Sequence, residues 1–154
     1  MPQHYFEDLE AGQVFRGEGR IVLDAQSIKD FAARYDPQPF HLDEEAAKDT
    51  IFAGLAASGW HTAAVTMRLL VGSSLKVAGG LVGAGMEELR WPTPVRPGDE
   101  LRVEAEVLGK RESKSRPQQG IVRVRTTTLN QNDEVVQLSV NTMIVPRRPV
   151  VRTR

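Results

Sequence analysis

An aspartate and a histidine lie close together in the segment from Tyr35 to Asp43 (YDPQPFHLD). In a proton transfer near neutral pH, an aspartate such as Asp36 and a histidine such as His41 can share the roles of the acid and the base. Pro37 and Pro39 fix two φ angles and favour extended backbone at the residues before them. We therefore expect a stiff loop that holds the carboxylate and the imidazole in one site at little cost in entropy.

A purely structural interpretation of this segment is also open. An aspartate that follows a helix often forms a turn, and His41 could simply pack beneath a loop. Phe40 and Leu42 flank His41, however, and indicate that the loop faces the interior, where Asp36 needs a defined partner. The flanking residues therefore favour a functional role.

We expect no metal or other cofactor at this segment. Asp43, Glu44 and Glu45 follow His41, but the spacing is neither H-x-H nor H-E-x-x-H. The chain also has no cysteine, which removes thiolate ligands, thiol nucleophiles and disulfides together.

Two helices in the first half of the chain must position the segment. Apolar residues at helical spacing predict a helix over residues 25–34, with Asp24 as its N-cap and Pro37 beyond its end. A second helix is predicted from about Gly59 to Val71, with Ser58 as its N-cap. Because this second helix is apolar on most sides, it must be buried on most sides.

The second half of the chain alternates apolar and polar residues. Three runs, over residues 101–107, 122–128 and 136–144, predict strands of a largely antiparallel sheet, and the third run has its even-numbered residues on the apolar face. Weaker patterns predict further strands over residues 81–91 and 14–23, and hence a sheet of five or more strands. The combination predicts an α+β protein in which a curved antiparallel sheet wraps one central helix.

The length of 154 residues indicates one domain. Four of the 20 basic residues lie within residues 147–154, so the rest of the chain has an excess of four acidic residues, which argues against nucleic-acid binding. We interpret residues 147–154 as a solvated basic tail rather than a phosphate-binding arm.

The first ten residues lack the basic and apolar regions of a secretory signal. The longest apolar stretch is well short of the roughly 20 residues that span a bilayer, so we expect no membrane partner and a cytoplasmic location.

Three segments in order resemble the MaoC-like family of hot-dog-fold dehydratases, which includes the (R)-specific enoyl-CoA hydratases. Asp36, Pro39, His41 and Asp43 are in register with the family pattern S-G-D-x-N-P-[LIV]-H-x-D. Residues 52–59 (FAGLAASG) and 88–99 (ELRWPTPVRPGD) are similar to the family's next two motifs. The resemblance runs over about residues 5–146, so we expect one hot-dog domain over residues 1–146, followed by the tail over residues 147–154.

This resemblance implies a lyase of fatty acid metabolism that adds water to a trans-2-enoyl-CoA or removes water from a 3-hydroxyacyl-CoA. The family's catalytic pair falls on Asp36 and His41, and its oxyanion donor, a backbone amide, falls on Gly59. We place Ser58 and Gln38 beside Gly59 in the substrate-binding part of the site. The partners implied are an acyl-CoA thioester and a second copy of the chain, in a homodimer with active sites near the interface.

Elementary chemistry agrees with this placement of Gly59. Hydration pushes negative charge onto the thioester oxygen, and unpaired amides at a helix N-terminus favour an anion. Gly59 is otherwise explained as a simple helix-entry glycine.

Three positions depart from the family pattern. Tyr35, Gln38 and Ser58 stand where the family usually has glycine, asparagine and histidine. The sequence leaves open which of Asp36 and His41 is the base. It also leaves open two rival functions, a non-catalytic acyl-thioester binding or interaction protein and a hot-dog thioesterase.

Other residues have simpler explanations. We interpret His61 as a satisfied core or pocket-lining histidine, and Trp60 and Trp91 as core or interface residues. The basic residues between Lys110 and Arg116 could meet CoA phosphates, but we expect them to form a solvated hairpin loop.

Overall fold

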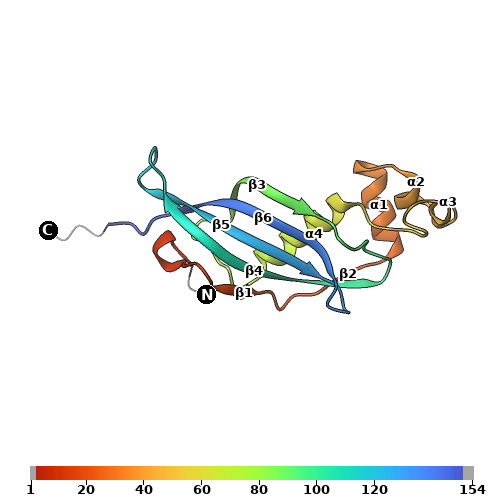
Figure 1. The fold of residues 1–154 in the computed structure, drawn as a ribbon, viewed down its shortest axis with the longest axis horizontal. Coiled ribbons are helices and arrows are strands. Elements are labelled where there is room, and N and C mark those ends of the chain that lie inside the picture. The colour runs from red at the N-terminus through yellow and green to blue at the C-terminus, as the bar shows by residue number, and fades with distance from the viewer. Residues whose placement is uncertain (1–2, 151–154) are drawn as a thin grey trace.

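The computed structural model describes residues 3–150 and has an antiparallel sheet with one long helix against it (Figure 1). In chain order the elements are the 3-10 helix η1 (Phe6–Asp8), strands β1 (Val14–Arg16) and β2 (Ile21–Leu23), helices α1 (Ala25–Tyr35), α2 (Pro39–Leu42), α3 (Glu44–Lys48) and α4 (Gly59–Val71), and strands β3 (Val82–Arg90), β4 (Asp99–Glu112), β5 (Gln119–Leu129) and β6 (Val135–Pro146). The predicted α+β class is confirmed.

The three predicted strands are β4, β5 and β6, which form an antiparallel meander, and β3 pairs with the free edge of β6. The opposite edge is shared by β1 and β2, which both pair with β4. Helices α1, α2 and α3 gather at one end of the sheet, and the hairpin between β4 and β5 lies at the other (Figure 1). The basic hairpin residues are therefore remote from the segment that carries Asp36 and His41.

The strand predicted over residues 14–23 is in fact two short strands. Glycine weakens a strand, and the chain leaves β4 after Gly17, whose N–H still donates to Val103 O at 3.0 Å. The Arg20 guanidinium donates to the carbonyls of Gly17, Glu18 and Gly19 at 3.3, 3.1 and 2.9 Å, which stabilises the bend between β1 and β2.

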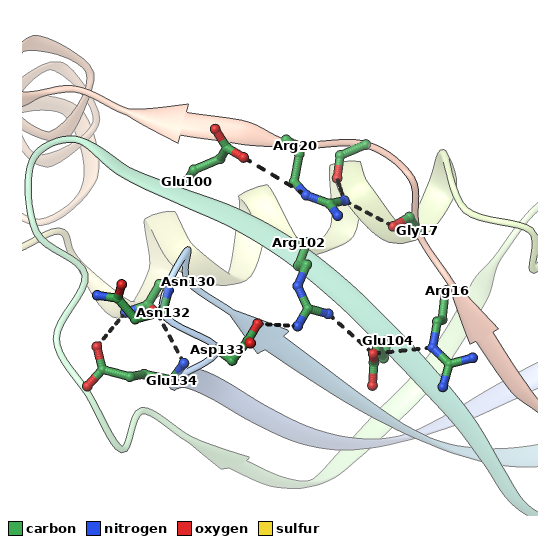
Figure 2. A network of polar contacts seen from close by, with 11 residues as sticks. Arg16, Gly17, Arg20, Glu100, Arg102, Glu104, Asn130, Asn132, Asp133 and Glu134 are labelled. Carbon is green, nitrogen blue, oxygen red and sulfur yellow. Dashed lines mark hydrogen bonds and ion pairs between the residues drawn. The ribbon is translucent and has the colours of Figure 1, made fainter.

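Surface ion pairs lie on the outer face of β4 (Figure 2). Arg102 reaches Glu104 at 3.2 Å and Asp133 at 2.6 Å, and Arg16 of β1 reaches the same Glu104 at 3.4 Å. Because exposed pairs are each worth about 0 to 1 kcal/mol, this network supports the register of β1 against β4 but does not decide the fold.

The prediction for the inner face of β6 is only partly right. The even-numbered Val136 and Val140 are buried as predicted, but Leu138, Thr142 and Ile144 are half-buried. The odd-numbered Gln137, Ser139, Met143 and Val145 are buried instead. Polar and apolar residues alternate too evenly along this strand for the pattern alone to identify the inner face. The packing of Met143 and Val145 in the core cluster decides it.

Helix α4 begins at Gly59 and ends at Val71, as predicted, but it is buried along one side only. Thr62, Thr66, Leu69 and Leu70 face the protein interior. Trp60, Met67 and Val71 are 57%, 46% and 45% exposed, because the sheet of a single chain covers only one side of the helix. The expectation of burial on most sides is therefore wrong for the isolated chain.

The start of the basic tail is paired with the N-terminal segment. Arg148 contacts Asp8 at 2.5 Å, its backbone N–H donates to Glu7 at 2.7 Å, and Arg147 reaches Glu112 at 3.2 Å. The described part of the tail thus pairs with the body through Arg147 and Arg148, while residues 148–150 stay exposed to solvent, as expected. Arg152 and Arg154 lie outside the described residues.

Within residues 3–150, no helix has both the length and the apolarity that a membrane span requires.

Candidate active site

Asp36 occupies the C-cap position of α1. Its N–H donates to Ala32 O at 2.9 Å, and Pro37 ends the helix because proline has no N–H to continue the hydrogen-bond ladder. Gln38 is extended (φ −113°, ψ 148°), in agreement with the effect of the proline that follows it. Asp36 (φ −153°, ψ 66°) is not in the extended region, so the expectation of extended backbone is wrong at this residue.

His41 lies on α2, a single helical turn where the sequence analysis predicted a loop. Pro39 takes the first position of this helix, which suits its fixed φ and missing N–H. The turn points His41 inward, and its side chain is only 5% exposed. The histidine Nδ1 lies 2.6 Å from Ala56 O. Because a carbonyl can only accept, Nδ1 carries the proton of this hydrogen bond.

The structure brings the predicted pair together. His41 Nε2 lies 3.2 Å from Asp36 Oδ2. With the Nδ1 proton committed to Ala56, a neutral His41 presents a lone pair at Nε2, opposite the lone pairs of the carboxylate. Two acceptors so close need a proton between them, either on the imidazole or on a shared water.

Both oxygens of Asp36 accept further hydrogen bonds. Ser58 Oγ donates to Oδ2 at 2.7 Å, and Gln38 Nε2 donates to Oδ1. Burial raises the pKa of Asp36, but the hydrogen bonds from Ser58 and Gln38, together with nearby His41, outweigh burial and hold this pKa below its usual value. Asp36 is therefore ionised at neutral pH. The ionised form stabilises the fold fully above the unfolded pKa of about 3.9, and this contribution is lost as pH falls through the lower folded value.

Replacing Ser58 with alanine should raise the pKa of Asp36, because the hydroxyl that donates to its carboxylate is lost. The same hydroxyl is the N-cap of α4 and accepts a hydrogen bond from Trp60 N at 3.3 Å. The free energy of unfolding of the variant should therefore be lower by about 1 kcal/mol. The carboxyl titration followed by NMR, with chemical denaturation, measures both effects. Ser27→Ala removes a comparable but exposed hydroxyl on α1 and serves as the control. An unchanged Asp36 titration in Ser58→Ala would contradict this account.

Gly59 begins α4 directly after Ser58. Within residues 3–150 its N–H meets no hydrogen-bond acceptor, whereas those of the next three residues bond to Ser58. Gly59 also lines the same cavity as Asp36 and His41. An unpaired amide at a helix N-terminus is a suitable donor to a developing oxyanion.

The cavity has a volume of about 370 Å³. Asp36, His41, Gln38 and Gly59 line it, while Ser58 is fully buried behind Asp36. Most of the remaining wall is apolar, and its largest contributors are Phe40, Phe52, Trp60, Trp91, Val95 and Val136. Trp60 and Trp91 therefore line the cavity, a role that the sequence analysis did not assign to them.

Arg96 has a role near the site that the sequence alone did not reveal. Its guanidinium donates to the carbonyls of Phe52, Gly54 (3.1 Å) and Leu55 (3.3 Å). This clamp fixes the loop that presents Ala56 O to His41 Nδ1. Arg96 lies within residues 88–99, which resemble a family motif, but only the folded chain shows which carbonyls it meets.

His61 lies outside the cavity wall. Its ring stacks on Phe31 at 4.7 Å between centroids, and its Nδ1 is buried without a hydrogen-bond partner among the described residues. The expectation of a satisfied histidine is therefore wrong. Burial lowers the pKa of His61, which keeps it neutral.

Within residues 3–150, no group of three or more His, Asp or Glu side chains is arranged to hold a metal ion.

Comparison with known proteins identifies the family. The MaoC-like domain model matches residues 8–130, and the chain belongs to this family. The structure of this chain matches the crystal structure of the MaoC-like dehydratase from Rhodospirillum rubrum with a TM-score of 0.91. The two sequences are 56% identical, and the match covers 96% of this chain and 99% of the dehydratase. The expected hot-dog fold is thereby confirmed.

Two further relatives are more distant. The uncharacterized protein YdeM of Bacillus subtilis is 32% identical over 82% of this chain and 88% of its own length. The (R)-hydratase from A. caviae involved in PHA biosynthesis has a TM-score of 0.71 and 26% identity, over 91% of this chain and 99% of that one. A dehydratase or hydratase of the MaoC-like class is therefore the broad assignment for this protein.

Proposed function

We propose that this protein hydrates a trans-2-enoyl-CoA to a 3-hydroxyacyl-CoA and catalyses the reverse dehydration. The observation that carries the proposal is the grouping of Asp36, His41 and the unpaired Gly59 amide around one cavity, with Asp36 Oδ2 and His41 Nε2 3.2 Å apart. The likeness to an (R)-hydratase supports the same chemistry.

In the proposed reaction the thioester oxygen accepts a hydrogen bond from Gly59 N–H. A water lies between Asp36 and His41, and His41 Nε2 removes one of its protons while the oxygen adds to C3. Negative charge moves to the thioester oxygen, where the helix N-terminus stabilises it. The proton held by His41 then returns to C2, so the atoms of one water are added across the double bond.

Asp36 and His41 have different tasks in this scheme. The Ala56 carbonyl fixes the Nδ1 proton and leaves Nε2 as the free base. Asp36 stays ionised, holds the water and stabilises the imidazolium that forms. Ser58 and Gln38 act through Asp36 by orienting its carboxylate, and we propose no direct contact of Ser58 with the substrate.

A panel of enoyl-CoA esters tests the proposal. Hydration removes the ultraviolet absorbance of the conjugated thioester and releases no thiol. Release of free CoA thiol instead would identify a thioesterase, and calorimetric binding without turnover would identify a non-catalytic acyl-thioester binding protein. Either result would overturn the hydratase proposal.

We also propose that the chain forms a homodimer through the uncovered side of α4. The exposed Trp60, Met67 and Val71 lie on this helix, and Val82 and Met86 of edge strand β3 are each 50% exposed. A second copy of the chain would cover the helix and pair with β3, which protects an otherwise open sheet edge. Sedimentation equilibrium should give twice the mass of the chain. The cytoplasmic location stays a prediction from the sequence.

A further inference from the structure

Trp91 lies at the start of a short strap that forms one wall of the cavity. The strap runs from Trp91 to Val95, directly after β3, and two prolines stiffen it (WPTPV). Val95 O accepts from Ala57 N at 2.9 Å, which ties the strap to the segment leading into α4. Trp91, Thr93, Pro94 and Val95 all face the cavity.

The Trp91 indole packs directly on the N-terminus of α4. A Cβ placed on Gly59 would lie 2.5 Å from Trp91 Cε2, so the indole occupies the space that any larger residue at position 59 would need. The ring of Trp60 meets it edge to face, with centroids 5.4 Å apart. The indole therefore lines the cavity in direct contact with the residue that carries the proposed oxyanion donor.

Gln137 anchors the indole from the other side. Trp91 Nε1 donates to Gln137 Oε1 at 2.9 Å, and Gln137 is only 1% exposed. A buried amide oxygen needs a donor, so this bond fixes both side chains. Gln137 does not line the cavity and has no part in the proposed proton transfer.

We propose that Trp91, positioned by Gln137, is the specificity-determining residue that closes the acyl end of the cavity and limits the substrate to short, apolar acyl groups. This inference rests on the proposed function and names the substrate class for the same site. Trp91 acts by its volume, and Gln137 is a positioning residue that acts through Trp91.

The size of the cavity supports a short acyl group. At roughly 30 Å³ for each water-sized volume, a cavity of about 370 Å³ holds about a dozen non-hydrogen atoms. A crotonyl thioester with its sulfur uses about half of that room, and the attacking water and the near end of the pantetheine use much of the rest. A trans-2-octenoyl thioester has four more carbon atoms than the crotonyl thioester, which leaves little room for the water and the pantetheine while Trp91 keeps its position.

The chemistry of the wall supports an apolar acyl group. Within residues 3–150, Asp36 and His41 are the only ionisable side chains that line the cavity, and Asp36 is negative. If the acyl group carried a free carboxylate, no cationic side chain in this wall would pair with it, and Asp36 would repel it.

The test compares kcat/KM for crotonyl-CoA and trans-2-octenoyl-CoA in four proteins. The wild type should prefer crotonyl-CoA by about 100-fold. Trp91→Ala should reduce the preference to about threefold, and Gln137→Met, which removes the acceptor but keeps the indole, should reduce it to about tenfold. Val22→Ala changes an exposed residue of β2 outside the cavity and should retain the wild-type ratio. The ratio is informative because a general loss of stability lowers both rates together.

Two results would overturn the inference. One is a wild type that hydrates both esters equally well, and the other is a Trp91→Ala ratio equal to that of Val22→Ala. If the wild type turns over no enoyl-CoA, the hydratase proposal fails, and calorimetry with saturated butyryl-CoA and octanoyl-CoA decides the role of Trp91. Tighter binding of butyryl-CoA, lost in Trp91→Ala, would then support it, whereas equal binding or no binding of the two esters would overturn it.

Discussion

Replacing His41 with alanine is expected to lower kcat for crotonyl-CoA hydration by about 1000-fold, the middle of the range for loss of a general acid or base. Nε2 is the imidazole nitrogen that is free to take a proton from water, because Nδ1 is bonded to Ala56. Asp36→Asn should lose a similar factor, since the neutral amide no longer stabilises the imidazolium. Steady-state kinetics with crotonyl-CoA measure both losses.

Matched variants separate chemistry from folding. Asp43→Asn also removes a carboxylate, but Asp43 is exposed and its oxygen caps α3, which asparagine can do as well. His61→Ala removes a histidine that does not line the cavity. Both controls should retain turnover within about threefold of the wild type. Wild-type turnover in either His41→Ala or Asp36→Asn would refute the assigned roles.

The second large effect is expected from Gly59→Ala. This variant keeps the backbone N–H, but the new Cβ would lie 2.5 Å from Trp91, so the indole or the first turn of α4 must move. Misplacement of an oxyanion donor costs up to about 100-fold in kcat, and overpacking should destabilise the chain by about 1 to 3 kcal/mol. Kinetics and urea denaturation measure the two effects separately.

A double variant identifies the cause of this loss. In Gly59→Ala with Trp91→Leu, the smaller side chain makes room for the new methyl group, so stability and kcat should both recover relative to Gly59→Ala alone. Gly72→Ala is the matched control at the other end of α4, where an added Cβ meets nothing closer than 3.6 Å. No recovery in the double variant would show that contact with Trp91 is not the cause.

Local sequence signals predicted the elements that carry the site. Asp24 and Ser58 cap α1 and α4 with their side chains, as expected, because the capping hydrogen bond is made within three residues. The two prolines predicted extended backbone at the residues before them, which is present at Gln38 but not at Asp36. The helical turn that carries His41 was missed, because one turn is too short to give a periodic pattern.

Signals that depend on distant residues failed. The strand break at Gly17 and the exposed side of α4 were predicted wrongly, and the inner face of β6 was predicted only in part. Each depends on what another part of the chain, or another chain, places against it. Propensity and periodicity describe only neighbours in sequence.

The sequence by itself determined the candidate pair Asp36 and His41, the helix that begins at Gly59 and the family resemblance that gives them roles. Their chemistry is a property of residue type and local spacing, which a linear chain displays. The tertiary structure decided that Ser58 and Gln38 hold the carboxylate, that Ala56 selects the free imidazole nitrogen, and that Trp91 and Gln137 bound the cavity. These contacts join residues that folding alone brings within hydrogen-bond distance, so no local pattern records them.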